Sequence, residues 1–298
     1  MRNVVLAATI GGAMAFAAAS TVHAQSADAA ASMTVMPANG FFAGVGVNGN
    51  LVSPSNQSMF SQGISQVYTA NTLVANGAAG GPTNPNAPMT SSISPSAQLG
   101  YFQKFSDSPW MWGAKFNYNY INATSTANFV LVPQRGSFQS TTTGVITPFT
   151  GNVVIQSYQV TVNHQLGFVP FVGYSFDRSY VYGGIGPSLT QVDAKLNNTV
   201  GFASIGGVSS SITGTPTSYS SSQWLIGATF AVGATYFLTP SWFLDLGYAF
   251  TLTDFFNNTY SSPFTNTSAG STTVGVLSGS YTGGVITHAI TVSINRRF

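Results

Sequence analysis

From Ile286 to Phe298, apolar and polar side chains alternate with a period of two. The odd positions carry small or polar residues, and the even positions are apolar except at His288 and Arg296. Because successive side chains point to opposite faces of a strand, the pattern predicts a β-strand with one apolar and one polar face. The apolar even positions are Ile286, Ile290, Val292, Ile294 and Phe298.

Seven earlier segments show the same period and are predicted as strands. Short turns follow the second, fourth and sixth strands, at residues 106–109, 177–178 and 238–240. Long segments rich in Ser, Thr, Asn and Gly follow the first, third, fifth and seventh, and are predicted as loops. An even number of strands with short turns on one side and long loops on the other is typical of transmembrane barrels. The predicted strands are residues 41–51, 93–105, 110–121, 157–176, 179–192, 223–237 and 242–253; the predicted loops are residues 52–92, 122–156, 193–222 and 255–283.

Aromatic residues gather near both ends of the predicted apolar faces. Two such belts flanking aliphatic residues are characteristic of a surface that faces lipid. In the strand at 157–176 the even positions are predicted to face lipid, beginning with Tyr158, Val160 and Val162. The belt near the short turns contains Phe41, Phe105, Trp110, Trp112, Tyr174, Phe176, Tyr236, Trp242 and Phe298, and the belt near the long loops contains Tyr118, Tyr120, Tyr158, Trp224 and Phe250.

The amino-acid composition further limits the classes of protein to which the chain could belong. Only 5% of the 298 residues are charged, against about 25% in ordinary soluble domains, and neither Glu nor Cys occurs. After the N-terminus, no stretch has the roughly 18 apolar residues that a membrane-spanning helix requires. These features leave a lipid-facing barrel, a secreted adhesive protein rich in Ser, Thr and Asn, or a soluble β-sandwich, whose strands also alternate.

The N-terminus resembles a targeting segment. Residues 1–24 are predicted as a signal peptide, with Arg2 before an apolar stretch and a small-residue cleavage site at 22–24. Residues 25–39 are predicted as a flexible segment, and residues 40–298 as the barrel. Cleavage would leave seven Lys and Arg against six Asp, a net charge of +1, which provides no basic field for nucleic acid.

Several of these segments resemble the outer-membrane β-barrel superfamily of OmpA-type and opacity-type proteins. They are residues 40–46, the hairpin at 174–184, and residues 244–248. The resemblance implies an eight-stranded antiparallel transmembrane β-barrel in the outer membrane, with short periplasmic turns and long extracellular loops. A barrel of this kind contacts outer-membrane lipid, and its long, nearly uncharged loops are compatible with contact to a host surface or phage.

The last strand resembles the signal that the barrel assembly machinery recognises in such proteins. In this chain the residues that match the signal are Ile290, Val292, Ile294 and the terminal Phe298. Arg296 departs from the pattern, which has an apolar residue at that place; at a membrane boundary an Arg can extend its charge into water.

Few charged residues are predicted inside the barrel. They are Lys104, Lys115, Asp245 and Arg297. An eight-stranded barrel is narrow enough for side chains to fill it, whereas an aqueous channel requires about 16 strands. We expect Asp245 to form a pair or small network with Arg297 or Lys115 that closes the periplasmic floor. The alternative is that these charges lie apart, solvated at the rim.

The residues required for catalysis are scarce. His164 and His288 are predicted on the lipid face, Glu is absent, and no nucleophile can be placed beside a base. We therefore expect no enzyme activity, no metal site and no cofactor. The expected function is a structural or surface-recognition role, such as adhesion or display. The alternative is a narrow channel for small or apolar solutes, as in OmpW-type barrels or small porins, and a lipid-modifying enzyme is disfavoured.

Overall fold

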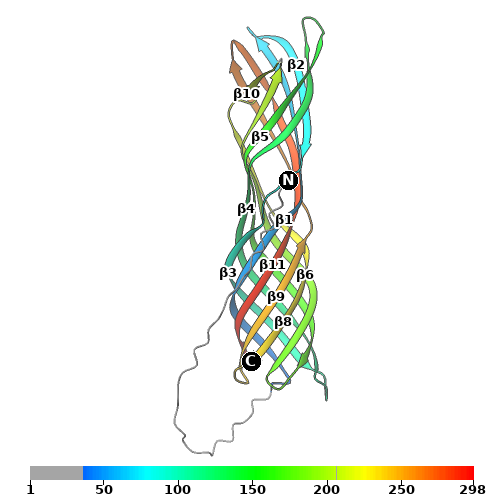
Figure 1. Ribbon diagram of the computed structural model, residues 1–298, viewed down its shortest axis with the longest axis vertical. Helices are drawn as coiled ribbons and strands as arrows, with labels where there is room; N and C mark the ends of the chain where they lie inside the picture. Colours follow the sequence, from blue (N-terminus) through cyan, green and yellow to red (C-terminus); the bar gives the residue numbers. More distant parts are fainter. Residues whose placement is uncertain (1–35, 206) are drawn as a thin grey trace, which may run out of the picture. The chain divides into compact units, whose positions relative to one another are not determined.

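The computed structural model describes residues 36–205 and 207–298 (Figure 1). The predicted signal peptide and residues 25–35 of the predicted flexible segment lie outside this range. In the part that is described, no helix is long and apolar enough to cross a membrane. The strands are β1 (Asn39–Thr69), β2 (Thr72–Thr83), β3 (Thr90–Lys104), β4 (Trp110–Ser140), β5 (Ile146–Ser175), β6 (Ser179–Ile205), β7 (Val208–Ser211), β8 (Thr217–Phe237), β9 (Trp242–Thr253), β10 (Phe256–Ser268) and β11 (Ser271–Arg297).

Eight of the strands form a closed antiparallel ring, which we call the membrane barrel. Its order is β1–β3–β4–β5–β6–β8–β9–β11, and β11 pairs with β1 from Arg297–Phe42 onward to close it. The backbone N–H of Phe298 donates to the carbonyl of Phe41 at 2.9 Å, so closure includes the last residue. The ring confirms the eight-stranded barrel predicted from the alternating segments.

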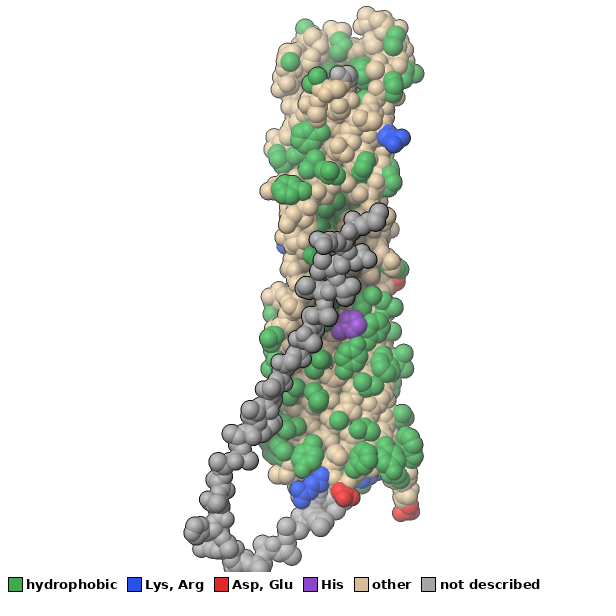
Figure 2. All heavy atoms as spheres, in the orientation of Figure 1, with side chains coloured by type: hydrophobic (Ala, Val, Ile, Leu, Met, Phe, Trp, Pro, Cys, Tyr) green, Lys and Arg blue, Asp and Glu red, His purple; other side chains and the backbone are tan. Residues whose placement is uncertain are grey.

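The outer surface of the membrane barrel is apolar. Figure 2 shows hydrophobic side chains crowded over the lower half of the view and mostly polar ones above. The aromatic residues predicted near the short turns are all exposed. Polar side chains such as Asn48, Gln98 and Asn295 are buried inside the same strands. An apolar outside, a polar inside and a ring without free edges are what a membrane-spanning barrel requires.

The strands continue far beyond this apolar band. β4 has 31 residues and β5 has 30, about three times the roughly 9–11 residues needed to cross a bilayer. The segments predicted as long loops are therefore largely strands, joined by tight hairpins. We call this second part the extension: residues 52–89, 121–162, 192–225 and 254–285, apart from residue 206. It contains β7 as well as β2 and β10, which are labelled in the upper part of Figure 1.

The extension has the opposite polarity to the membrane barrel. On β10, Phe256 and Tyr260 are buried inside, while Asn257 and Thr259 face outward. The reversal begins at β-bulges, which insert an extra residue into a strand and change which positions face inward. Register shifts occur between Ser55 and Ser58 on β1, between Tyr120 and Ala123 on β4, and between Val162 and Gln165 on β5.

These bulges correct one part of the predicted outer face. Val162 and Gln165 are three residues apart, yet both point inward, with exposed fractions of 0% and 4%. Tyr158, Val160 and Val162 consequently lie in the apolar core of the extension instead of facing lipid. Asn56 and Asn122 have φ angles of 49° and 47° in the bulges of β1 and β4, a conformation that Asn tolerates better than most residues.

We predict that the two outer surfaces respond differently to charge. Leu246 on the membrane barrel and Ile64 on the extension have the same exposed fraction, 54%. Leu246→Arg should lower the free energy of unfolding by about 2–4 kcal/mol, because its charge would lie in hydrocarbon. Ile64→Arg, the matched control, should change it by about 0.5 kcal/mol or less. Urea unfolding in lipid vesicles, followed by the electrophoretic shift of folded barrels, measures both. Equal losses would contradict the assignment of the lipid-facing surface.

Candidate functional site

The base of the membrane barrel is filled by aromatic side chains. Phe237 stands at the centre of this group, with ring centroids 5.0 Å from Phe243 and 6.0 Å from Phe102. Met36, the first described residue, is buried against it, and its backbone N–H donates to the carbonyl of Asp177 at 2.8 Å. We call this group the basal aromatic cluster. It comprises Met36, Phe42, Phe102, Met111, Phe171, Tyr180, Tyr182, Phe237 and Phe243.

A buried ion pair adjoins the basal aromatic cluster. Lys115 of β4 and Asp245 of β9 lie on strands that are not neighbours, and their Nζ and Oδ2 atoms are 2.7 Å apart across the lumen. Thr235 donates a hydrogen bond to Oδ1 of Asp245 at 2.8 Å, and Tyr182 donates to Oδ2 at 3.3 Å. The Lys115 ammonium also lies 3.9 Å from the centroid of the Tyr182 ring. Both charges are therefore desolvated but supplied with partners, as buried charges require.

The other predicted interior charges lie elsewhere. Arg297, the alternative partner of Asp245, instead donates to the backbone carbonyls of Pro240 at 2.8 Å and Asn39 at 3.1 Å. Its guanidinium thus ties the β8–β9 turn to the start of β1 at the rim. Lys104 is half-buried at the end of β3, apart from the pair. The floor is closed by the basal aromatic cluster, and the ion pair lies next to it.

Neutral polar side chains fill the next layer of the lumen. Gln98 donates to Ser293 at 2.8 Å and to Asn295 at 2.6 Å, and Asn48 donates to Asn119 at 2.6 Å. A polar cavity of about 50 Å³ remains beside the ion pair and is lined partly by Gln98. That volume holds a few water molecules at most.

The extension has a packed apolar core directly beyond this polar layer. Val52, Ile121 and Val285 begin it, and rings from β5, β10 and β11 meet at its centre. Tyr158 and Tyr281 have ring centroids 6.4 Å apart, and the hydroxyl of Tyr260 is hydrogen-bonded to Ser61. Burial raises the pKa of Tyr260 to about 12 and raises the pKa of Tyr158 as well. The rings of Tyr158, Tyr260 and Tyr281 are thus buried in a core from which water is excluded.

The residues of the predicted assembly signal are on the outer face of β11. Ile290, Val292 and Ile294 are exposed, and so is Phe298 at the end of the chain. The Arg296 guanidinium lies over two rings at the same rim, 5.9 Å from Trp242 and 5.5 Å from Phe298. Recognition of these residues by the assembly machinery stays a prediction.

His164 and His288, the two histidines among the described residues, lie outside the lumen. Nδ1 of His164 is 2.9 Å from the hydroxyl of Tyr118, and Nδ1 of His288 is 2.8 Å from the hydroxyl of Tyr248. Each pair joins neighbouring strands on the outer surface. Within residues 36–205 and 207–298, no three His, Cys, Asp or Glu side chains gather where they could hold a metal ion.

The comparisons with known proteins find similarity only at the level of structure. No family model matches the chain, and no curated protein matches its sequence. The attachment invasion locus protein Ail of Yersinia pestis matches with a TM-score of 0.26 and 11% identity, over 82% of this chain and 99% of that one. The outer membrane protein OprG of Pseudomonas aeruginosa matches with a TM-score of 0.31 and 10% identity, over 87% and 96%. The outer membrane protease OmpT of Escherichia coli matches with a TM-score of 0.24 and 12% identity, over 85% and 97%.

OprG and OmpT are outer membrane proteins by name. The outer-membrane location of this chain follows from its own closed ring and apolar band, which are the hallmarks of barrels in that membrane. At these TM-scores and identities, the resemblances carry no argument about activity.

We predict that the ion pair stabilises the barrel as a unit. Asp245→Asn should lower the free energy of unfolding by about 3–5 kcal/mol, because it leaves the Lys115 charge buried without a counter-charge. The double variant Lys115→Met/Asp245→Asn should recover most of that loss. Arg297→Gln serves as the control and should cost about 1 kcal/mol or less, since its partners are carbonyls at an exposed rim. Urea titration in vesicles distinguishes these cases, and an unchanged Asp245→Asn barrel would refute the role of the pair.

Proposed function

We propose that this protein is a non-catalytic outer-membrane barrel whose extension recognises other surfaces outside the cell. Adhesion to a host surface, attachment of phage and surface display are the forms of recognition that we consider. The proposal depends above all on one observation: the strands continue beyond the apolar band as a folded structure with its own core. A barrel that served only to span the membrane would not need this second part.

Two properties of the extension support recognition. First, β1 and β11 stay paired from the periplasmic rim to Thr69 and Ser271 near the tip. This continuous ladder makes the extension a stiff support. Second, its outer surface is mainly uncharged and rich in hydroxyl and amide groups. Along β10 the outward residues are Asn257, Thr259, Ser261, Pro263, Thr265 and Thr267. Such a surface can make many directional hydrogen bonds without long-range repulsion.

Attachment of whole cells tests this function. Cells that display the full chain should attach to a surface that it recognises, tested against a panel of host cells, matrix proteins and phage. A shortened chain should lose attachment, because it retains the membrane barrel and lacks most of the extension. Its four cuts are made between residues that pair across each hairpin, and each is closed by an Asn-Gly turn. The pairs are Met59–Thr83, Val130–Ile155, Leu196–Tyr219 and Tyr260–Gly279.

The comparison requires equal amounts of folded protein at the surface. The electrophoretic shift between unheated and boiled samples shows whether the shortened barrel has assembled. Attachment by both chains to the same extent, or by neither to any member of the panel, would count against recognition by the extension.

The second candidate, a narrow channel, is favoured by one observation. The polar layer and its cavity of about 50 Å³ lie within the membrane barrel. However, the basal aromatic cluster lies on one side of this layer and the apolar core of the extension on the other. A solute would therefore have to displace packed side chains at two levels, which densely packed interiors resist.

We accordingly expect no reproducible single-channel steps from the purified protein in planar lipid bilayers. The variant Asp245→Asn tests whether the ion pair gates a channel, and it should also give no single-channel steps. Regular steps with the unmodified chain that change in size with Asp245→Asn would favour the channel over the recognition role.

A further inference from the structure

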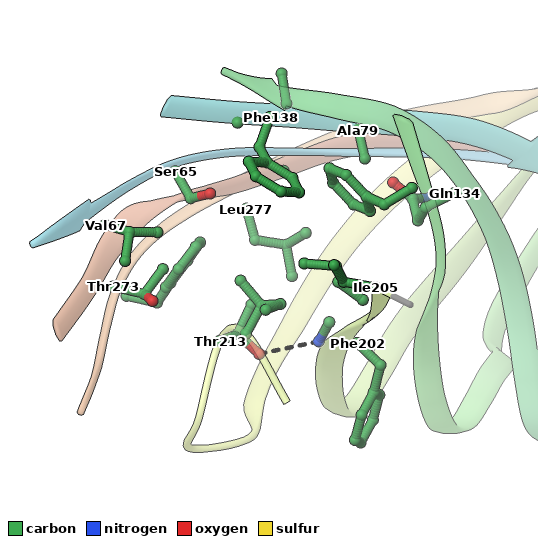
Figure 3. Close-up of a pocket in the computed structure, with 18 of the residues that line it drawn as sticks. Ser65, Val67, Ala79, Gln134, Phe138, Phe202, Ile205, Thr213, Thr273 and Leu277 are labelled. Carbon is green, nitrogen blue, oxygen red and sulfur yellow. Dashed lines mark hydrogen bonds between the residues drawn. The ribbon is translucent and has the colours of Figure 1, made fainter. Parts of the chain in front are cut away.

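The interior of the extension is not filled to its tip. A cavity of about 260 Å³ lies between β1, β2, β4, β5, β6 and β11, beyond the packed tyrosines (Figure 3). Its floor is buried and its rim is open: Val153 at the floor is 1% exposed, whereas Ile205 at the rim is 42% exposed. In Figure 3, Phe138, Leu277 and Ser65 point into the space between the strands.

The cavity exists because several of the inward side chains around it are small. On β1 the inward residue Met59 belongs to the packed core, Gly63 and Ser65 then leave space, and Val67 follows them in the lining. A Cβ atom built on Gly63 would meet nothing within 4 Å, which shows open space at that point. Neighbouring strands contribute Ala79 and Ala203 to the same wall. The gap is thus formed by small residues on several strands and not by one misplaced side chain.

The chemistry of the wall selects the kind of molecule that fits. Among the described residues that line it, none is charged, and Phe138 and Phe149 present their rings 6.4 Å apart. The hydroxyl oxygen of Thr213 accepts a hydrogen bond from the backbone N–H of Gly201 at 2.9 Å, so its proton is free to be donated. An apolar cavity of roughly 150 Å³ already binds benzene in other proteins. Burying apolar surface here would release water from a wall that offers it few hydrogen bonds.

We propose that this cavity, which we call the distal cavity, binds a small uncharged molecule. Its ligand is largely apolar, of one or two aromatic rings or similar bulk, with at most one hydrogen-bond acceptor for Thr213. The site lies outside the membrane-spanning part and is separated from the polar lumen by the apolar core of the extension. It therefore receives its ligand from the surrounding medium and is not a step on a path through the barrel. This inference is independent of surface recognition, because attachment can persist with the cavity filled.

The test uses the full chain in lipid nanodiscs and para-fluorobenzyl alcohol as the probe. Fluorine NMR should detect saturable broadening of the probe signal above that of empty nanodiscs. The variant Gly63→Leu/Ser65→Leu places two side chains in the distal cavity and should weaken binding by about tenfold or more, since the ligand loses the space and its contacts. The control Gln62→Leu/Gln66→Leu adds the same side chain twice to the outward face of the same strand and should bind like the unmodified chain.

Two results would overturn the proposal. One is the absence of saturable binding by the unmodified chain. The other is equal binding by the filled and control variants, which would assign the signal to lipid or to another surface. If the double filling prevents folding, as judged by the electrophoretic shift, Gly63→Leu alone provides the same comparison because its side chain enters open space. Single filling should then reduce binding while Gln66→Leu does not.

Discussion

Every feature of this protein depends on the pairing of β11 with β1, because that pairing closes the ring. In hydrocarbon an unpaired backbone N–H or C=O has no water to bond to, so a sheet with a free edge cannot span the membrane. Closure around only eight strands then fixes a narrow lumen that side chains must fill. The Lys115–Asp245 pair, the amide and hydroxyl layer and the basal aromatic cluster are three ways of filling it. The first two satisfy polar groups, and the third excludes water at the rim.

The same ring continues beyond the membrane, where its physical requirements reverse. Water now surrounds the outside, so apolar side chains there are no longer stabilised, and the inside is the only place to bury them. β-bulges make the change possible without breaking the strands. On β1 the bulge at Asn56 separates the buried residues Val52 and Met59 by an odd number of positions, so the inward parity changes along a continuous strand. One sheet can therefore contact lipid at one end and water at the other.

This reversal explains which parts of the fold could be predicted from the sequence. Segments that face lipid have large apolar residues at every second position, and their strands, turns and aromatic belts follow directly from that period. In the extension many of the outward residues are Ser, Thr and Asn, so the contrast between the two faces is weaker, and a bulge shifts the period by one. Segments such as 122–156 consequently resemble loops. Tyr158 continues the parity of the lipid-facing residues after it, and the shift between Val162 and Gln165 that turns it inward leaves no sign in the composition.

The interior of the site was predictable only in part for a related reason. The alternation of apolar and polar residues predicts that Lys115, Asp245 and Arg297 point away from lipid. It does not predict which of these side chains are in contact with one another. β4 and β9 are not neighbours in the ring, so the approach of Lys115 to Asp245 depends on the lumen's width and on small residues such as Gly233 that leave room for Tyr182. Arg297 is on β11, directly beside β9, yet the carbonyl of Pro240 lies within its reach at the rim. A guanidinium bonded to carbonyls at a solvated rim avoids the desolvation that entry into the lumen would impose.

A filled lumen restricts where function can lie. The polar layer of the membrane barrel lies between two packed groups of side chains, the basal aromatic cluster and the tyrosine-containing core. The surfaces that other molecules can reach are then the outer face of the extension and the distal cavity at its tip. The small inward residues at Gly63, Ala79 and Ala203 depart from the dense packing found nearer the membrane. The proposed ligand would bury the apolar wall that these small residues leave open and so release the water in contact with it.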